Sequence, residues 1–144
     1  MGTGDPTASL SVAEALRFMG SLLPGGWPEL MRRNHDLALA GRKILCRALK
    51  LELPCPSEFI GSLASVPMPD ATDATPSKSP LYLDALQDQL LDQHAIEVPI
   101  IPWPAPPKRL LRISAQLYNS LPQYERLAQA ITEWRMSLPY GTMQ

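Results

Sequence analysis

The segment Leu110-Leu111-Arg112-Ile113-Ser114-Ala115-Gln116-Leu117-Tyr118-Asn119 decides how the second half of this chain folds. Its residues alternate between apolar and polar in the manner of a strand that is buried on one side. One face of that strand would carry Leu111, Ile113, Ala115 and Leu117. The other face would carry Arg112, Ser114 and Gln116. The pattern therefore predicts a β-strand with a guanidinium, a hydroxyl and an amide on its polar side.

Arg112 is the first candidate for a ligand-binding residue. A guanidinium that is fixed on a stiff strand can hold a small carboxylate through paired N–H···O bonds, and it stays charged across the working pH range. The alternative is a solvated arginine on the polar side of an edge strand, which alternation alone favours. Arg109 is a weaker candidate, because it would face the other side unless the strand contains a bulge.

Two helices are expected at the start of the chain. The capping-box pattern Ser11-Val12-Ala13-Glu14 predicts the start of a short helix, and Pro24-Gly25-Gly26 predicts its end. A second, long and basic helix is expected from Pro28 to about Lys50. Its apolar residues recur every seven positions and form a stripe, which contains Leu30, Leu37, Ile44 and Leu51.

The rest of the chain predicts an α+β arrangement. Strands are expected over 59–68 and 95–103, a loop over 70–79 and a helix over 80–93. A last helix should carry Tyr124, Leu127, Ala128, Ile131 and Trp134 on one side. This order of elements predicts a two-layer sandwich, in which a small, mostly antiparallel three-stranded sheet has helices on one face and follows a long helical arm.

Composition excludes several classes of protein. A chain of 144 residues suits one domain, or one small domain with a helical appendage. Its net charge of −1 gives no general attraction to nucleic acid or acidic lipid, and Glu29 and Asp36 interrupt the basic face of the long helix. No apolar run approaches the roughly 20 residues that span a bilayer. We therefore expect neither a nucleic-acid nor a membrane partner.

The cysteines and histidines do not form a recognisable site. Cys46 and Cys55 have neither CxxC nor metal-ligand spacing, so a reducing, cytoplasmic location is expected. Cys46 lies near the apolar stripe, and Cys55 lies between two prolines without a neighbouring base, so neither is expected to be catalytic. His35 and His94 have no metal-ligating neighbours in the sequence, and no metal site is predicted.

The segment from Arg112 to Asn119 and the helix that opens near 122–128 together resemble the end of the class V aminotransferase family. The isopenicillin N epimerase-like and cysteine desulfurase-like branch matches best. Further matches are Gly2-Thr3-Gly4-Asp5-Pro6, the segment 61–69 and Ile96-Glu97-Val98-Pro99-Ile100. The resemblance extends over about residues 2–134 and covers roughly the last third of such enzymes.

This resemblance implies the small domain of a fold-type I enzyme that depends on pyridoxal 5′-phosphate (PLP). The chain would then divide into the end of a large domain (1–27), a long connecting helix (28–52), an α+β small domain (53–136) and a tail (137–144). A large PLP-binding domain or a homodimer partner would complete the enzyme. Its amino-acid substrate would undergo epimerisation, C–S cleavage or transamination.

The resemblance also implies roles for two residues. Arg112 matches the arginine that binds the α-carboxylate of the substrate. Thr3 matches a threonine that reaches the phosphate of the PLP bound in the neighbouring subunit, and the alternative for Thr3 is an ordinary polar chain start.

PLP chemistry needs a lysine that forms a Schiff base with the cofactor. None of the lysines of this sequence matches the family lysine; they are Lys43, Lys50, Lys78 and Lys108. We therefore expect the chain alone to lack this lysine, to bind no PLP and to be inactive. The alternative is a non-catalytic α+β module, which would bind an amino acid or dimerise through the apolar stripe of the long helix.

Overall fold

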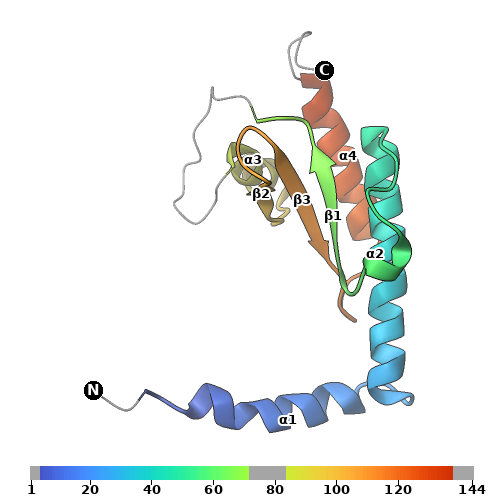
Figure 1. Ribbon diagram of the computed structural model, residues 1–144, viewed down its shortest axis with the longest axis vertical. Coiled ribbons are helices and arrows are strands. Elements are labelled where there is room, and N and C mark those ends of the chain that lie inside the picture. Colours follow the sequence, from blue (N-terminus) through green and yellow to red (C-terminus); the bar gives the residue numbers. More distant parts are fainter. Residues whose placement is uncertain (1–3, 72–83, 138–144) are drawn as a thin grey trace.

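The computed structural model describes residues 4–71 and 84–137 and confirms the predicted α+β class. Within these two ranges, four helices accompany one three-stranded sheet (Figure 1). The elements in chain order are α1 (Thr7–Ser21), α2 (Gly26–Leu49), the 3-10 turn η1 (Ser57–Phe59), β1 (Leu63–Met68), α3 (Ala85–His94), β2 (Ile100–Pro102), β3 (Arg109–Ser114) and α4 (Leu121–Ser137). Within the described ranges, no helix combines the length and the apolar character needed to cross a membrane.

β3 is the central strand of the sheet. The strand order is β1-β3-β2, and β3 pairs antiparallel with both neighbours. The register places Ser65 of β1 opposite Arg112, and Val66 opposite Leu111. Arg112 therefore lies on an inner strand, and the alternative that placed it on an edge strand is wrong.

The buried face of the sheet packs against the helices. Leu111 and Ile113 of β3 are at most 1% exposed, as the alternation predicts. α2 and α4 run side by side over this face (Figure 1). The close approach depends on Gly41 of α2, because a Cβ there would lie 2.9 Å from Cδ1 of Ile113 and 3.0 Å from Cγ of Tyr124.

One face of α2 packs against the rest of the domain. The buried residues of this helix are Leu30, Asn34, Ala38, Gly41, Arg42, Leu45, Cys46 and Leu49. Three of them, Leu45, Cys46 and Leu49, belong to the same core cluster as residues of the sheet, α3 and α4. Of the predicted stripe residues, Leu30 is buried, Leu37 and Ile44 are partly buried against the core, and Leu51 is 41% exposed and lies beyond the end of the helix. Dimerisation along this helix stays a prediction.

α1 begins earlier than the capping-box pattern predicts. The backbone N–H of Thr7 donates to Oδ1 of Asp5 at 3.0 Å, and the Ser11 hydroxyl donates to the carbonyl of Ala8 inside the helix. The predicted start at Ser11 is wrong because Asp5 supplies the acceptor at the first turn instead.

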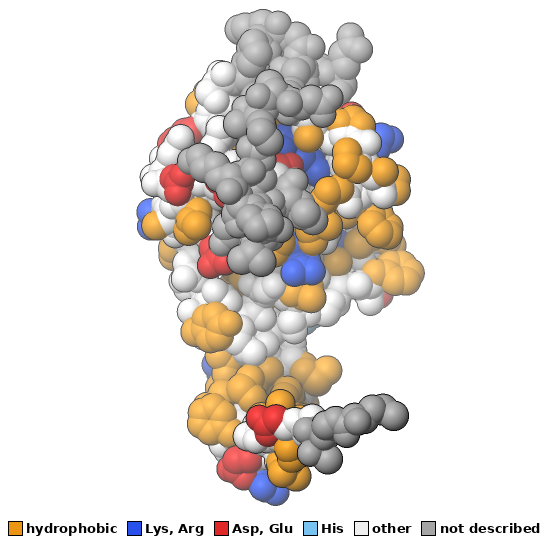
Figure 2. All heavy atoms as spheres, turned by 90° about the vertical axis from the view of Figure 1, so that its left-hand side faces the viewer, with side chains coloured by type: hydrophobic (Ala, Val, Ile, Leu, Met, Phe, Trp, Pro, Cys, Tyr) orange, Lys and Arg blue, Asp and Glu red, His pale blue; other side chains and the backbone are white. Residues whose placement is uncertain are grey.

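α1 has no buried residue and runs across the foot of α2, apart from the sheet (Figure 1). Trp27 holds the corner between the helices, since its Nε1 donates to the carbonyl of Leu16 at 3.1 Å. Figure 2 shows hydrophobic side chains gathered over this foot of the molecule. The large exposed hydrophobic residues of α1 and its C-cap are Leu10, Val12, Leu16, Phe18 and Leu22.

The expected strands are shorter in the structure. β1 starts at Leu63 because 57–59 form a 3-10 turn, and β2 contains only Ile100–Pro102. The helix expected from residue 80 is seen from Ala85. Residues 72–83 lie outside the described part, and so does most of the predicted loop over 70–79.

Candidate functional site

Arg112 projects from the middle of β3 on the side opposite the buried Leu111 and Ile113. Its side chain lines a pocket of about 370 Å³ between the segment that precedes β2, the end of β3 and the start of α4. The other polar residues of this pocket are Glu97, Ser114, Tyr118, Asn119, Gln123, Tyr124 and Arg126. The sequence placed Ser114 on the same face as Arg112, and both line the pocket.

One nitrogen of the Arg112 guanidinium has no partner in the described part of the chain. This nitrogen is Nε, which is buried, whereas the backbone N–H of Arg112 donates to the carbonyl of Pro99 at 3.0 Å. A buried donor without a partner costs about 1–3 kcal/mol. A carboxylate can accept two parallel bonds from one guanidinium. The arrangement therefore suits an anionic ligand with a planar acceptor group.

The turn that follows β3 forms one wall of the pocket. The predicted strand continues to Asn119, but β3 ends at Ser114 because side chains satisfy the next backbone groups. The N–H of Gln116 donates to Oδ1 of Asn119 at 3.0 Å, and the N–H of Leu117 donates to Oε1 of Gln116 at 2.8 Å. Tyr118 projects from this turn and is 82% exposed.

Hydrogen bonds join the same turn to α4. Oε1 of Gln123 accepts from the backbone N–H of Ser120 at 2.9 Å and from Nδ2 of Asn119 at 3.3 Å. The hydroxyl of Tyr124 donates to the carbonyl of Ser114 at 2.7 Å. Burial raises the pKa of Tyr124, and the neighbouring Tyr118 raises it further. The end of β3 and the start of α4 therefore form one connected structure.

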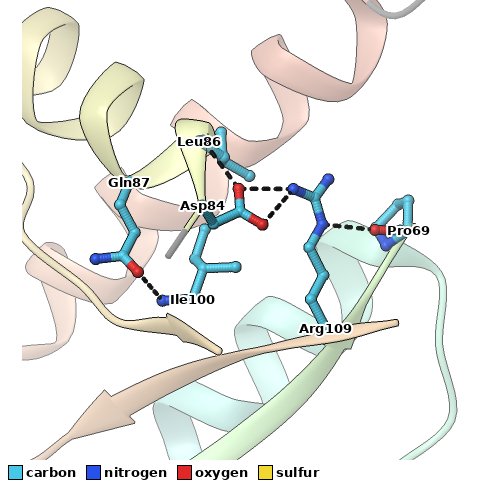
Figure 3. A network of polar contacts seen from close by, with 6 residues as sticks. All are labelled: Pro69, Asp84, Leu86, Gln87, Ile100 and Arg109. Atoms are coloured by element: carbon cyan, nitrogen blue, oxygen red, sulfur yellow. Dashed lines mark hydrogen bonds and ion pairs between the residues drawn. The ribbon is translucent and has the colours of Figure 1, made fainter. Parts of the chain in front are cut away.

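Arg109 has a different role, which Figure 3 shows. Its NH1 donates to both carboxylate oxygens of Asp84 at 2.7 Å, and its Nε donates to the carbonyl of Pro69 at 2.8 Å. The ring of Trp134 lies 5.2 Å from the guanidinium carbon. Asp84 also accepts from the N–H of Leu86 and so caps α3. Arg109 faces away from the Arg112 side, as expected, and it is occupied in holding α3 to the sheet.

Cys46 and Cys55 differ in their surroundings. Cys46 is 2% exposed, and burial raises the pKa of its thiol. Cys55 is partly exposed, and NH1 of Arg42 lies 3.0 Å from its carbonyl oxygen and 3.4 Å from its Sγ. Neither cysteine lines the Arg112 pocket.

The histidines lie apart from each other. Nδ1 of His35 is 2.9 Å from the carbonyl of Ile60, so it donates there, and the carbonyl of His94 accepts from Arg126 at 2.7 Å. Across residues 4–71 and 84–137, no three His, Cys, Asp or Glu side chains are grouped so that they could hold a metal ion. Thr3, for which the sequence suggests a role, lies outside the described residues.

Sequence reasoning missed two residues that support the site, Asn34 and Tyr124. Tyr124 was expected only as an apolar residue of the last helix, but its hydroxyl fixes the end of β3. Asn34 is 3% exposed and donates to Gln116. Its position midway between Leu30 and Ala38, at steps of four residues, places an amide on the buried face of α2. This four-residue spacing was the feature of the sequence that could have identified Asn34 as a buried polar residue.

Comparison with known proteins finds similarity along nearly the whole chain, although no family model matches it. The chain is 30% identical over 137 residues to a probable chloroplastic L-cysteine desulfhydrase of Arabidopsis thaliana, and the match covers 91% of this chain and 28% of that protein. It is 32% identical over 134 residues to an isopenicillin N epimerase of Amycolatopsis lactamdurans, with 92% and 30% covered. A putative L-cysteine desulfhydrase of Oryza sativa subsp. japonica is 27% identical over 150 residues, with 92% and 30% covered. The chain thus spans about three-tenths of the length of the curated relatives that it matches, and it is similar to one part of L-cysteine desulfhydrases and of an isopenicillin N epimerase.

Proposed function

We propose that this chain is the substrate-side domain of a PLP-dependent enzyme that acts on an amino acid, and that Arg112 binds the carboxylate of that substrate. The observation that carries the proposal is the buried, unpartnered Nε of Arg112 at the wall of a pocket. Two further points support it. Relatives named for L-cysteine and for isopenicillin N match this chain along nine-tenths of its length, and the Arg112 segment resembles the carboxylate-binding segment of class V aminotransferases.

The place of Arg112 in the sheet suits the proposed role. An inner strand is fixed by hydrogen bonds on both sides, so the backbone that carries Arg112 needs no further ordering when a ligand binds. Two parallel bonds from one guanidinium fix the position and the plane of a carboxylate. The chain's own contribution in this proposal is therefore binding and orientation of the amino acid.

The described residues do not fit a PLP site by themselves. A Schiff-base lysine is needed, yet Lys43, Lys50 and Lys108 are exposed, and no described lysine lines the Arg112 pocket. In the proposal, the cofactor belongs to the part of the enzyme that corresponds to the remaining length of the relatives, and the chain alone is inactive. The proposed contact of Thr3 with the cofactor phosphate in a partner subunit belongs to the same assembly.

The exposed apolar side of α1 supports a partner in that assembly. Leu10 is 76% exposed and Phe18 is 59% exposed, on a helix that buries none of its own residues. Exposed apolar side chains that gather in one region, as they do here (Figure 2), mark an interaction site. In the proposal, this surface contacts the large domain or a second subunit.

The test is a set of single substitutions in the full-length protein. Removing charged hydrogen bonds worth about 1.5–3 kcal/mol should raise the KM for L-cysteine, or for the best L-amino acid of a panel, about 10- to 100-fold in Arg112→Ala. PLP uptake, followed by absorbance, should not change. Arg112→Lys should recover only part of the loss, because an ammonium lacks the planar pair of donors.

Arg32→Ala is the matched control, because Arg32 is an exposed arginine that forms an ion pair with Asp36 on the surface of α2. Its kinetics should equal those of the wild type. Unchanged amino-acid kinetics in Arg112→Ala would rule out the carboxylate role.

A further inference from the structure

We infer that Asn34, on α2, is a positioning residue for the Arg112 pocket, and that it acts by holding the turn over 115–120 through Gln116. The hydrogen-bond geometry is independent of the ligand. That the pocket binds an amino acid rests on the proposed function.

Asn34 is a buried amide in an apolar seam. It is 3% exposed, and its neighbours at four-residue spacing on the same face are Leu30 and Ala38, which are also buried. Its Nδ2 donates to Oε1 of Gln116 at 3.0 Å, across 82 positions in the sequence. A buried amide is unfavourable without a hydrogen bond, so Asn34 and Gln116 are held to each other.

Gln116 passes this restraint to the turn. Its Oε1 accepts from Asn34 and also from the backbone N–H of Leu117 at 2.8 Å, and its own backbone N–H donates to Asn119. Asn119 in turn donates to Gln123 on α4. The turn is therefore attached to α2 on one side and to α4 on the other.

The position of the turn sets one wall of the pocket. Tyr118 and Asn119 line the pocket together with Arg112, and Tyr118 makes little contact with the rest of the described chain because it is 82% exposed. The Asn34 bond therefore helps to set where Tyr118 is presented, together with the hydrogen bonds inside the turn, whereas Arg112 is fixed separately by the pairing of β3. Loss of this bond should move the wall and leave the guanidinium in place.

The contact needs a donor at 34 and an acceptor at 116. Asn34→Asp keeps the size of the side chain but removes the donor, and it places two acceptors opposite each other. Gln116→Glu also keeps the size and retains an acceptor for both Asn34 and Leu117. The two isosteric substitutions should therefore have unequal effects on the turn, and Asn34→Ala, which adds no charge, separates the loss of the donor from the cost of burying a carboxylate.

The first measurement is amide hydrogen exchange of this chain, followed by NMR. Asn34→Asp should speed exchange at Gln116 and Leu117 about tenfold, the equivalent of about 1.4 kcal/mol. Gln116→Glu should stay within about threefold of the wild type. Asn34→Ala removes the donor without adding a charge, and it serves as the donor-free variant if Asn34→Asp does not fold.

The second measurement is the dependence of turnover on L-cysteine in the full-length protein. Asn34→Ala should raise KM about 3- to 10-fold with kcat within about twofold, because a displaced wall weakens amino-acid binding. A purely structural role would instead lower the fraction of active enzyme at unchanged KM.

Wild-type exchange and wild-type KM in Asn34→Ala would overturn the inference, and so would equal effects of Asn34→Asp and Gln116→Glu. If Arg112→Ala leaves KM unchanged while Asn34→Ala speeds exchange, the proposed function fails and the restraint on the turn stands.

Discussion

Arg109 and Asp84 form a buried ion pair in which one guanidinium nitrogen lies 2.7 Å from both carboxylate oxygens and each side chain is 8% exposed. Removing one partner would leave the other charge buried, which costs about 3–5 kcal/mol. We expect Asp84→Ala to lower the free energy of unfolding in urea by that amount, part of it from the lost cap of α3. Asp36→Ala, which breaks the exposed pair with Arg32, should cost no more than about 1 kcal/mol. Equal losses in the two variants would contradict the structural role of Asp84.

Gly41 is the point of closest approach between α2, β3 and α4. In Gly41→Ala the new Cβ would lie 2.9 Å from Cδ1 of Ile113, so the core would have to shift. Overpacking of this kind costs about 1–3 kcal/mol, which outweighs the gain of at most about 1 kcal/mol in helix propensity. Thermal unfolding should show a net loss. Gly61→Ala is the control, because no atom lies within 4 Å of its new Cβ, and it should have little effect.

Tyr124 should make the fold sensitive to alkaline pH. Burial holds its pKa above that of an unfolded tyrosine, which is about 10, so the folded state favours the neutral phenol. The stabilisation is complete below that value and is lost as the pH rises through the folded pKa. We expect the free energy of unfolding to fall more steeply above about pH 10 in the wild type than in Tyr124→Phe.

The same substitution has a predictable effect at neutral pH. Tyr124→Phe removes the 2.7 Å bond to the carbonyl of Ser114 and should cost about 0.5–1.5 kcal/mol at pH 7. Parallel pH curves for the two proteins would show that Tyr124 does not determine the alkaline loss.

The two thiols should react at different rates. Cys46 is 2% exposed with a raised pKa, and Cys55 is partly exposed. Because the thiolate is the reactive form and access is needed, an aromatic disulfide reagent should modify one thiol rapidly in the native chain and both in denaturant. Cys55→Ser should abolish the rapid phase, and Cys46→Ser should keep it. A rapid phase that survives Cys55→Ser would contradict the burial of Cys46.

The sequence predicted the elements that depend on regular alternation or periodicity. β3 has the predicted alternation of Leu111, Arg112 and Ile113, and α2 forms where the apolar periodicity predicted a long helix. Both patterns are local in the sequence. The class of fold followed from the order of these elements. The ends of elements were less predictable, because local side-chain acceptors decide them. Asp5 accepts a hydrogen bond at the first turn of α1, which begins before the predicted start. Gln116 accepts the N–H of Leu117, and β3 ends before the predicted end.

The candidate site could be predicted only in part. The alternation of β3 predicted on which side of the sheet Arg112 lies. That Arg112 binds a carboxylate is implied by the family resemblance and stays a prediction. The partner of Arg109 is Asp84, 25 residues away, and the partner of Asn34 is Gln116, 82 residues away. Pairings over such separations are set by the packing of helices on the sheet, which one sequence does not display.

The sheet order β1-β3-β2 separates two properties that enzymes often have to balance. In the proposed function, the residue that binds the carboxylate lies on the innermost strand, whereas the adjoining wall is a short turn fixed by a few side-chain amides. Substitutions in the turn can therefore reshape what is accepted without displacing that residue. Engineering of ligand preference in this fold should begin at Tyr118 and leave β3 untouched.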